Sequence, residues 1–175
     1  DYAFFSVQKG FGLPSGLGVL LVHKTVLEKN LDSKSEPPAS RFHSLPSWTK
    51  YSVKDQTPET PNVHAIYLLG KVIKDMLDYG LDNIRSEAGE KYSLLETAVD
   101  DHPQLEFSVQ NKKFRSPTVS SLRVNGSAEN LIKELQLKGF QVGSGYGVQK
   151  KDHIRIANFP ATCVEDMKDI CQVMI

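Results

Sequence analysis

Two short apolar runs joined by a glycine-rich bend open the chain, and they limit the folds that it can adopt. The runs Tyr2–Phe5 and Leu17–Val22 have the length and composition of β-strands, and the bend Gly10–Gly16 lies between them. Lys9 stands at the start of this bend. Glycines let a backbone approach a ligand closely, and a lysine amine without its proton can form a Schiff base with an aldehyde. Most lysines at strand ends are solvated, so the bend alone leaves both interpretations open.

Predicted helices and short strands alternate along much of the remaining chain. Apolar periodicity predicts helices over 25–30, 62–80, 81–99, 128–138 and from Thr162 to the C-terminus. Short apolar runs between turn signals predict strands over 105–109, 118–124, 140–142 and 153–157. Ser127 is the predicted N-cap of one helix, and Thr162 with Glu165 the predicted capping box of the last. The sequence therefore predicts an α/β protein whose second half is a small α+β unit.

Residues 33–61 differ from the rest of the chain in composition. They contain five prolines among many serines and threonines, which predicts a long connection without regular structure. Long connections in compact domains often carry function, so Arg41 and His43 are candidates to approach a ligand. An ordinary surface loop is the alternative interpretation.

Composition and charge disfavour several classes of function. The 21 basic and 21 acidic side chains give a net charge of zero, so we expect no nucleic-acid or anionic-membrane partner. No apolar run approaches the roughly 20 residues that span a bilayer, and His23, His64 and His102 show no metal-ligand spacing with the cysteines. Cys163 and Cys171 would lie roughly 12 Å apart on one helix, too far for a disulfide. Free thiols indicate a reducing compartment, which we take to be the cytoplasm.

Three segments in order along the chain carry a family resemblance: Ser6–Val22, Glu59–Tyr67 and His153–Pro160. Together they resemble the class V aminotransferases, which are fold-type I enzymes dependent on pyridoxal phosphate, and especially the phosphoserine aminotransferases among them. The chain also opens inside a strand-like run without an initiator methionine, so we expect a C-terminal half of a longer protein.

The resemblance implies a domain organisation. Residues 1–61 would be the end of the large cofactor-binding domain, with its strand–lysine turn–strand and a long proline-rich loop. Residues 62–80 would be a connecting helix, and residues 81–175 a small C-terminal α+β domain. The glycine-rich phosphate turn, the ring-stacking aromatic and the aspartate for the pyridine nitrogen would all precede this chain, so the fragment alone is expected to be inactive.

The resemblance also implies roles for individual residues. Lys9 would hold pyridoxal phosphate through a Schiff base and move a proton during transamination, and Gln8 would hydrogen-bond the cofactor phosphate. Thr60 would reach the phosphate of the partner subunit's cofactor in a homodimer with shared active sites. Glu59 stands where phosphoserine aminotransferases often have asparagine, and a carboxylate beside a phosphate is unfavourable.

Arg155 would bind the substrate α-carboxylate. A guanidinium meets a carboxylate through two parallel hydrogen bonds, which fix orientation as well as charge. An arginine that alternates with apolar residues is also typical of the solvent-facing side of a strand, and that alternative stays open. Positions 148–149 lack the basic His-Arg pair with which phosphoserine aminotransferases hold the substrate phosphate, so Lys150, Lys151, Arg41 and His43 are the remaining candidates.

The leading hypothesis is transamination between O-phosphoserine and 2-oxoglutarate in serine biosynthesis. The alternatives are another class V transaminase of the alanine–glyoxylate or serine–glyoxylate type, a desulfurase-like reaction, and a non-catalytic α+β interaction module. Neither cysteine lies on a plausible mobile active-site loop, which argues against desulfuration.

Overall fold

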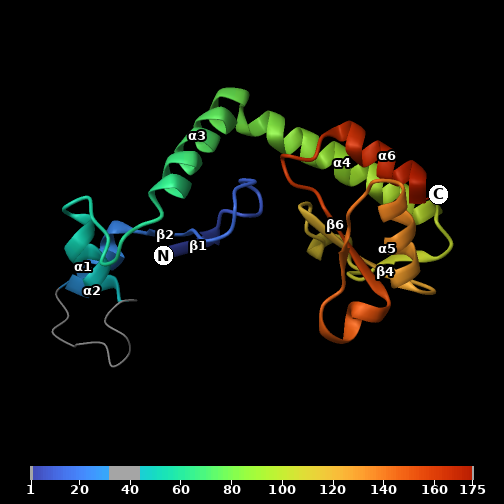
Figure 1. Cartoon of the computed structure of the whole chain (residues 1–175), viewed down its shortest axis with the longest axis horizontal. Helices are drawn as coiled ribbons and strands as arrows, with labels where there is room; N and C mark the ends of the chain where they lie inside the picture. Colours follow the sequence, from blue (N-terminus) through green and yellow to red (C-terminus); the bar gives the residue numbers. More distant parts are fainter. Residues whose placement is uncertain (1, 32–43, 175) are drawn as a thin grey trace. The chain divides into compact units, whose positions relative to one another are not determined.

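A computed structural model describes residues 2–31 and 44–174 (Figure 1). The chain divides into two compact units, one that ends at Ile73 and one that begins at Lys74, and we describe each by itself. No helix within the described ranges is both long and apolar enough to cross a membrane.

The first unit begins with the predicted strand–bend–strand. Strand β1 (Tyr2–Ser6) pairs antiparallel with β2 (Gly18–Val22). Val7, which is fully buried, closes the bend from inside: its N–H donates to the Leu17 carbonyl at 3.3 Å, and its own carbonyl accepts from the Leu13 N–H at 3.2 Å. The bend is therefore a fixed structure rather than a loose connection.

Two short helices follow in the first unit, α1 (Lys24–Leu31) and α2 (Leu45–Ser52). The first confirms the helix predicted over 25–30. The second shows that the prediction of no regular structure over 33–61 was wrong for that stretch. Pro46 lies in the first helical turn, where a missing N–H costs nothing, and the Ser44 hydroxyl accepts from the Ser47 N–H at 3.3 Å as the N-cap.

Helix α3 (Val63–Tyr79) begins in the first unit, and α4 (Leu81–Asp101) belongs to the second. The Asn62 side chain caps α3 by accepting from the Ala65 N–H at 3.1 Å. Gly80 separates the two helices with a φ of 100°, a conformation that favours glycine. The helices predicted to meet at Gly80 are thus confirmed.

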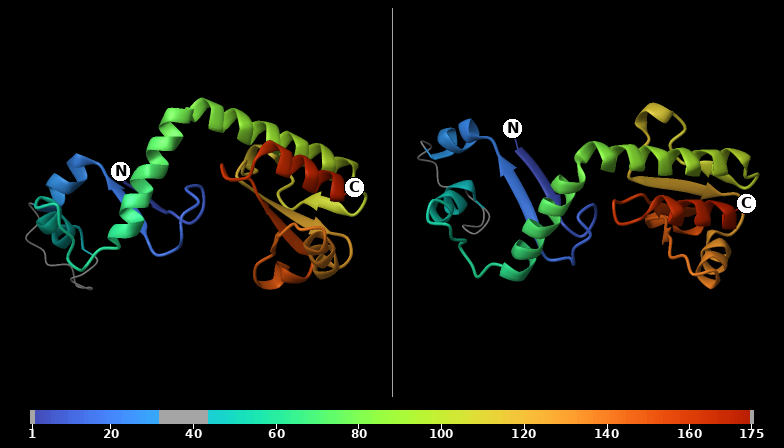
Figure 2. Two further views of the ribbon diagram at one scale, coloured as in Figure 1. Left: turned by 45° about the horizontal axis from the view of Figure 1, so that its top comes forward. Right: turned by 90° about the horizontal axis from the view of Figure 1, so that it is seen from above.

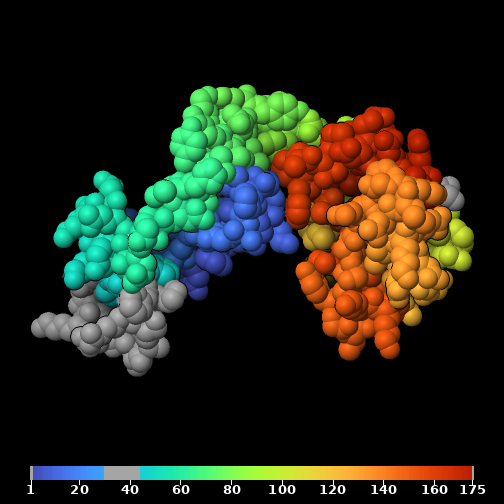
Figure 3. Space-filling view, in the orientation of Figure 1, coloured from blue at the N-terminus to red at the C-terminus, as the bar shows by residue number. Residues whose placement is uncertain are grey.

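The second unit is a four-stranded antiparallel sheet with helices packed on it (Figure 2). Its strands in spatial order are β3 (Leu105–Phe107), β4 (Val119–Val124), β6 (His153–Ala157) and β5 (Gly143–Ser144). Helix α4 lies beside α6 (Val164–Met174), and α5 (Ala128–Leu137) contacts α6, β5 and β6. In the space-filling view α5 and α6 form a continuous surface of this unit (Figure 3).

A single apolar core holds the second unit together. It contains side chains from β4, β6 and all three helices, with Leu122, Leu135 and Ile154 fully buried. Residues Ser120, Leu122 and Val124 alternate inward along β4, as expected for a strand with one covered face. Helix α6 buries one face, formed by Met167, Ile170, Cys171 and Met174.

Two local predictions in the second unit were wrong. Residues 140–142 form no strand, and strand pairing begins only at Gly143. The apolar residues Phe140 and Val142, which suggested a strand, instead pack against the core without strand pairing. The last helix is capped one residue later than predicted. The Cys163 N–H donates to the Asp166 carboxylate at 2.9 Å, and the Asp166 N–H donates to the Cys163 sulfur at 3.4 Å. The predicted N-cap of α5 is confirmed, since the Ser127 hydroxyl accepts from the Asn130 N–H.

Candidate functional site

Lys9 lies exposed on the bend between β1 and β2. Its carbonyl accepts from the Gly12 N–H at 2.9 Å, and Gly12 has a φ of 64°. A Cβ atom built at Gly10 or Gly12 would meet nothing within 4 Å, so the space around the bend is open. Within the described residues the Lys9 amine has no hydrogen bond or ion pair. The bend therefore holds the backbone of Lys9 in place and leaves its amine available.

The exit of this bend and the start of α3 lie close together within the first unit. Asn62, which caps α3, has its Nδ2 atom 3.8 Å from the position of a Cβ atom at Gly16. A groove of about 910 Å³ lies between the two segments, lined on one side by Gly16–Gly18 and on the other by residues that include Glu59 and Asn62. Thr60 is exposed in this second segment and lines an adjoining groove. Gln8 is exposed beside Lys9.

Arg155 lies half-buried on β6 in the second unit, and three neighbours surround its guanidinium. The Nε–H donates to the Ser144 carbonyl at 2.7 Å. The Tyr146 ring centroid lies 3.8 Å from Cζ on one side. The backbone of Gly143 lies so close that a Cβ atom there would be 2.8 Å from Nη2. Within the described residues Nη1 and Nη2 have no acceptor, so the edge that binds carboxylates is unused.

Arg115 in the same unit provides an internal comparison. Its guanidinium also lies over an aromatic ring, that of Phe107, at 3.9 Å. All its nitrogens are used, however: Nε donates to the Val109 carbonyl at 2.8 Å, Nη1 to Glu96 at 2.9 Å and Nη2 to the Gln110 carbonyl at 3.3 Å. Arg115 is thus a structural arginine, and the free edge of Arg155 is not a general feature of this fold.

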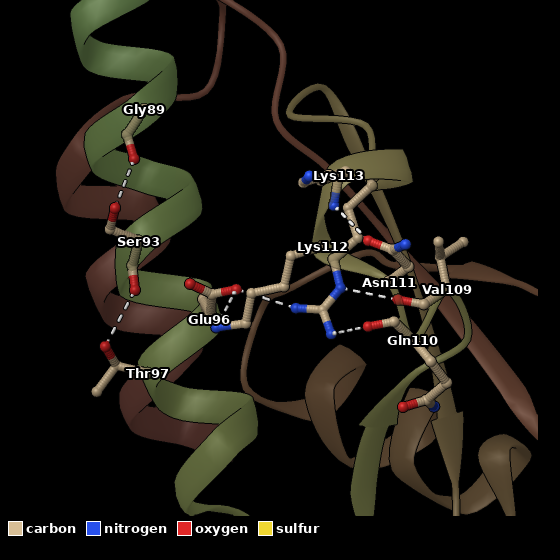
Figure 4. Close-up of polar contacts among 10 residues, drawn as sticks. Gly89, Ser93, Glu96, Thr97, Val109, Gln110, Asn111, Lys112 and Lys113 are labelled. Carbon is tan, nitrogen blue, oxygen red and sulfur yellow. Dashed lines mark hydrogen bonds and ion pairs between the residues drawn. The ribbon is translucent and has the colours of Figure 1, made fainter.

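The bonds of Arg115 tie the connection between β3 and β4 to helix α4. Figure 4 labels their partners, Glu96 on α4 and Val109 and Gln110 on the connection. Glu96 on α4 also accepts from Lys112 at 3.1 Å. The Asn111 side chain caps the short 3₁₀ helix η2 (Lys112–Phe114) by accepting from the Lys113 N–H at 3.0 Å. Along α4 the hydroxyl of Ser93 donates to the Gly89 carbonyl and that of Thr97 to the Ser93 carbonyl.

Two buried polar residues fix the segment that follows the Arg155 strand, and the sequence did not reveal them. The Asn158 amide donates to the Ala88 and Pro117 carbonyls, each at 2.8 Å. The Lys91 ammonium, which is 1% exposed, donates to the Phe159 carbonyl at 3.0 Å and to the Thr162 carbonyl at 2.6 Å. Burial lowers the pKa of Lys91 below its ordinary value. A lysine on a predicted helix carries no local signal of such burial.

The predicted site residues fall into two groups. Lys9, Gln8 and Thr60 belong to the first unit, and Arg155 belongs to the second. Arg41 and His43 lie outside the described residues.

Lys150 and Lys151 are exposed on the 3₁₀ helix η3 (Gly147–Lys151), and no ion pair holds either of them in the part of the chain that the structure describes. Among residues 2–31 and 44–174, no group of three His, Cys, Asp or Glu side chains could hold a metal ion.

Comparisons with known proteins support a single family. The family model Aminotransferase class-V matches residues 1–161. A putative phosphoserine aminotransferase of Mycobacterium avium (strain 104) is 27% identical over 98% of this chain and 47% of its own length. A serine–glyoxylate aminotransferase of Hyphomicrobium methylovorum is 30% identical over 82% of this chain and 35% of its own length. The chain thus spans about half the length, or less, of the curated relatives that it matches.

Solved structures extend the comparison to the fold. The crystal structure of a phosphoserine aminotransferase from Cytophaga hutchinsonii matches with a TM-score of 0.92 and 40% identity, over 99% of this chain and 48% of that one. A phosphoserine aminotransferase from Trichomonas vaginalis, solved with pyridoxal phosphate bound, shares the fold at a TM-score of 0.80 and 20% identity, over 99% of this chain and 47% of that one. Because the family model covers most of the sequence, this chain belongs to the class V aminotransferases.

Proposed function

We propose that the protein containing this chain is a pyridoxal-phosphate-dependent transaminase that exchanges an amino group between O-phosphoserine and 2-oxoglutarate in serine biosynthesis. The proposed substrate rests on the 40% identity to the Cytophaga hutchinsonii phosphoserine aminotransferase over nearly the whole chain. The proposed reaction rests on membership of the class V aminotransferase family.

The residues of the first unit fit a cofactor that presents an aldehyde and a phosphate. The Lys9 amine is exposed and unpaired within the described residues, on a bend with open space around its glycines. Pyridoxal phosphate, when bound, supplies the aldehyde and an electron-withdrawing ring. Lys9 would hold the cofactor through its amine, and, once the substrate amine has taken its place, the lysine amine would move a proton at the substrate α-carbon. The Gln8 amide donates to the cofactor phosphate.

Arg155 binds the α-carboxylate through its two free amino groups. The amino donor and the oxo-acid acceptor both carry a carboxylate next to the reacting carbon, so one arginine serves both halves of the exchange. The amino group leaves the donor, which becomes an oxo acid, and is delivered to the acceptor, so no outside oxidant or reductant is needed.

The substrate phosphate is held by cations other than the His-Arg pair, which positions 148–149 lack. Lys150 and Lys151 are exposed and unpaired within the described residues, and they lie four to five positions before Arg155. Arg41 and His43 are the further candidates.

We also propose the assembly in which this chemistry takes place. The protein is a cytoplasmic homodimer with shared active sites, in which Thr60 of one subunit reaches the cofactor phosphate of the other. Residues 1–61 end the large domain, residues 62–80 form the connecting helix and residues 81–175 form the small domain. Since the chain spans about half the length of its curated relatives, it supplies only part of each active site.

A second candidate function is serine–glyoxylate or alanine–glyoxylate transamination. The Hyphomicrobium methylovorum relative, which is 30% identical over 82% of this chain, favours it. The absence of a basic pair at positions 148–149 favours it as well, because serine and alanine carry no phosphate.

The test uses the complete protein that contains this chain. Borohydride reduction should fix pyridoxal phosphate on the peptide that carries Lys9, and Lys9→Ala should abolish both the labelling and amino transfer. Lys54→Ala, at an exposed lysine of the same unit, is the matched control and should change neither. Full activity in Lys9→Ala would exclude the proposed reaction, and failure to bind pyridoxal phosphate would favour a non-catalytic module. Comparing O-phosphoserine with serine and alanine as donors separates the two transaminase candidates.

A further inference from the structure

We propose that Tyr146 and Gly143 are positioning residues that pack against the guanidinium of Arg155 and fix its plane, so that its free edge is presented to a substrate carboxylate. This inference rests on the proposed function of Arg155 and adds two residues to it.

Tyr146 forms one side of this arrangement. Its ring centroid lies 3.8 Å from Cζ of Arg155, although the tyrosine as a whole is 69% exposed. No hydrogen bond to its hydroxyl is present within the described residues, so its direct partner there is the cation. A guanidinium stacked on an aromatic ring is attracted by the ring electrons and loses freedom to rotate.

Gly143 provides a second contact. It pairs directly with Arg155 across the β5–β6 ladder, and a Cβ atom there would lie 2.8 Å from Nη2 and 3.2 Å from Cζ. The φ of Gly143 lies outside the left-handed region, so its backbone does not require glycine. A side chain at this position would displace the guanidinium from its present place, so glycine lets Arg155 keep it.

The residues between these two complete the arrangement. The Ser144 carbonyl accepts from Nε of Arg155 and fixes the guanidinium at that atom. At Gly145 a Cβ atom would lie 2.3 Å from the Gln149 carbonyl oxygen, so the backbone here leaves no room for a side chain. Among the residues that the structure describes, no acceptor occupies the edge formed by Nη1 and Nη2.

The comparison with Arg115 shows why this arrangement indicates a ligand. Both arginines stack on an aromatic ring, at 3.9 Å for Arg115 and 3.8 Å for Arg155. Every guanidinium nitrogen of Arg115 donates to a protein acceptor. Within the described residues, only Nε of Arg155 does so. A guanidinium that is immobilised while its two amino groups keep free donors is preorganised to bind an anionic ligand. It loses little conformational freedom when that anion binds.

Three variants of the complete protein test the proposal. Tyr146→Leu removes the ring and should raise KM for both the amino donor and the oxo acid by roughly two- to thirty-fold, the range expected for losing a cation–π contact. Gly143→Ala displaces the guanidinium and should also raise both KM values. Tyr146→Phe keeps the ring and should stay near the parent values. Phe114→Leu, at an exposed aromatic residue of the same unit, is the matched control and should change neither KM.

Additional measurements separate positioning from a general structural effect. The thermal midpoint and the absorbance titration with pyridoxal phosphate should change little in Tyr146→Leu and Gly143→Ala, because the displaced atoms end a flexible side chain. Calorimetric binding of glutarate, a dicarboxylate that cannot react, should weaken in step with the rise in KM. Unchanged KM values, or a rise for only one of the two substrates, would overturn the proposal.

Arg155→Lys distinguishes this inference from the proposed function. If Arg155→Lys leaves both KM values unchanged, the carboxylate role of Arg155 fails, and the inference fails with it. If Arg155→Lys raises both KM values and Tyr146→Leu raises neither, only the inference on Tyr146 is wrong.

Discussion

The buried ammonium of Lys91 lies 2.6 Å from the carbonyl oxygen of Thr162, 71 positions further along the chain. With a second bond to the Phe159 carbonyl, it joins helix α4 to the segment that connects β6 with α6. The segment after the strand that carries Arg155 is thereby tied to helix α4.

Replacing Lys91 by methionine should destabilise the second unit. Lys91→Met keeps the length of the side chain but removes the ammonium donor from two partly buried carbonyls, at a cost of about 1–3 kcal/mol. The urea-unfolding midpoint, followed by circular dichroism, measures the loss. Lys133→Met, at an exposed lysine whose ion pair with Glu129 is worth about 0.5 kcal/mol or less, is the control. Equal midpoints for the two variants would contradict the structural role of Lys91.

The stability of the fold should fall between pH 9 and pH 11 because of Cys171. Burial raises the pKa of this thiol from 9.0 to about 11. Over that interval the unfolded chain loses a proton that the folded chain keeps, so stability that is fully present below pH 9 is lost as the pH rises towards 11. The difference between these two pKa values corresponds to about 2–3 kcal/mol in the free energy of unfolding.

Cys171→Ala isolates this effect. Lys91, whose pKa is lowered, acts in the opposite direction at alkaline pH, but it contributes equally to the parent and the variant and cancels in their difference. The free energy of unfolding, measured by urea titration at several pH values, should therefore fall less steeply in Cys171→Ala. Cys163→Ser, at the exposed cysteine, should keep the parent slope. Parallel curves for Cys171→Ala and the parent would refute the assignment.

The two thiols should differ in their reaction with iodoacetamide. Cys163 is exposed at the start of α6, whereas Cys171 is buried and its raised pKa keeps it protonated. Mass spectrometry after brief alkylation near neutral pH should find the label on the Cys163 peptide, with Cys171 labelled only in urea. Early labelling of Cys171 in the native protein would show that the core around α6 opens more readily than the structure indicates.

Removing the Glu96 carboxylate should loosen the connection between β3 and β4. Arg115 is 10% exposed at its side chain and relies on Glu96 for its one full counter-charge, so Glu96→Gln should cost about 1–3 kcal/mol. Amide hydrogen exchange over 108–118 should become faster. Lys112→Ala, which removes the exposed partner of the same carboxylate, should change exchange little. No difference between the two variants would mean that Glu96 does not order this connection.

Local patterns in the sequence predicted much of this fold, and they failed where tertiary contacts decide. The strand over 153–157 and the helix beginning after Ser127 were predictable because their apolar period and cap lie within a few residues. Helix α2 was missed because Pro46 was taken as a breaker, although it lies in the first turn.

The candidate site was only partly predictable for the same reason. Lys9 and Arg155 stand in recognisable segments. The burial of Lys91 and the contact of Tyr146 with Arg155 depend on partners that the fold brings together, and single-residue patterns do not encode such partners.

The short strand β5 and the turn after it imply an uneven tolerance to mutation along four consecutive residues. At Gly145 a side chain would clash with backbone, and at Gly143 it would displace the guanidinium of Arg155. Ser144 contributes only its carbonyl to Arg155, so many residues would serve at that position. Tyr146 requires an aromatic ring but not its hydroxyl. Saturation mutagenesis of these four positions should therefore return the pattern glycine, any residue, glycine, aromatic. Other sequences with this pattern nine to twelve positions before an arginine are candidates for the same packing around a guanidinium.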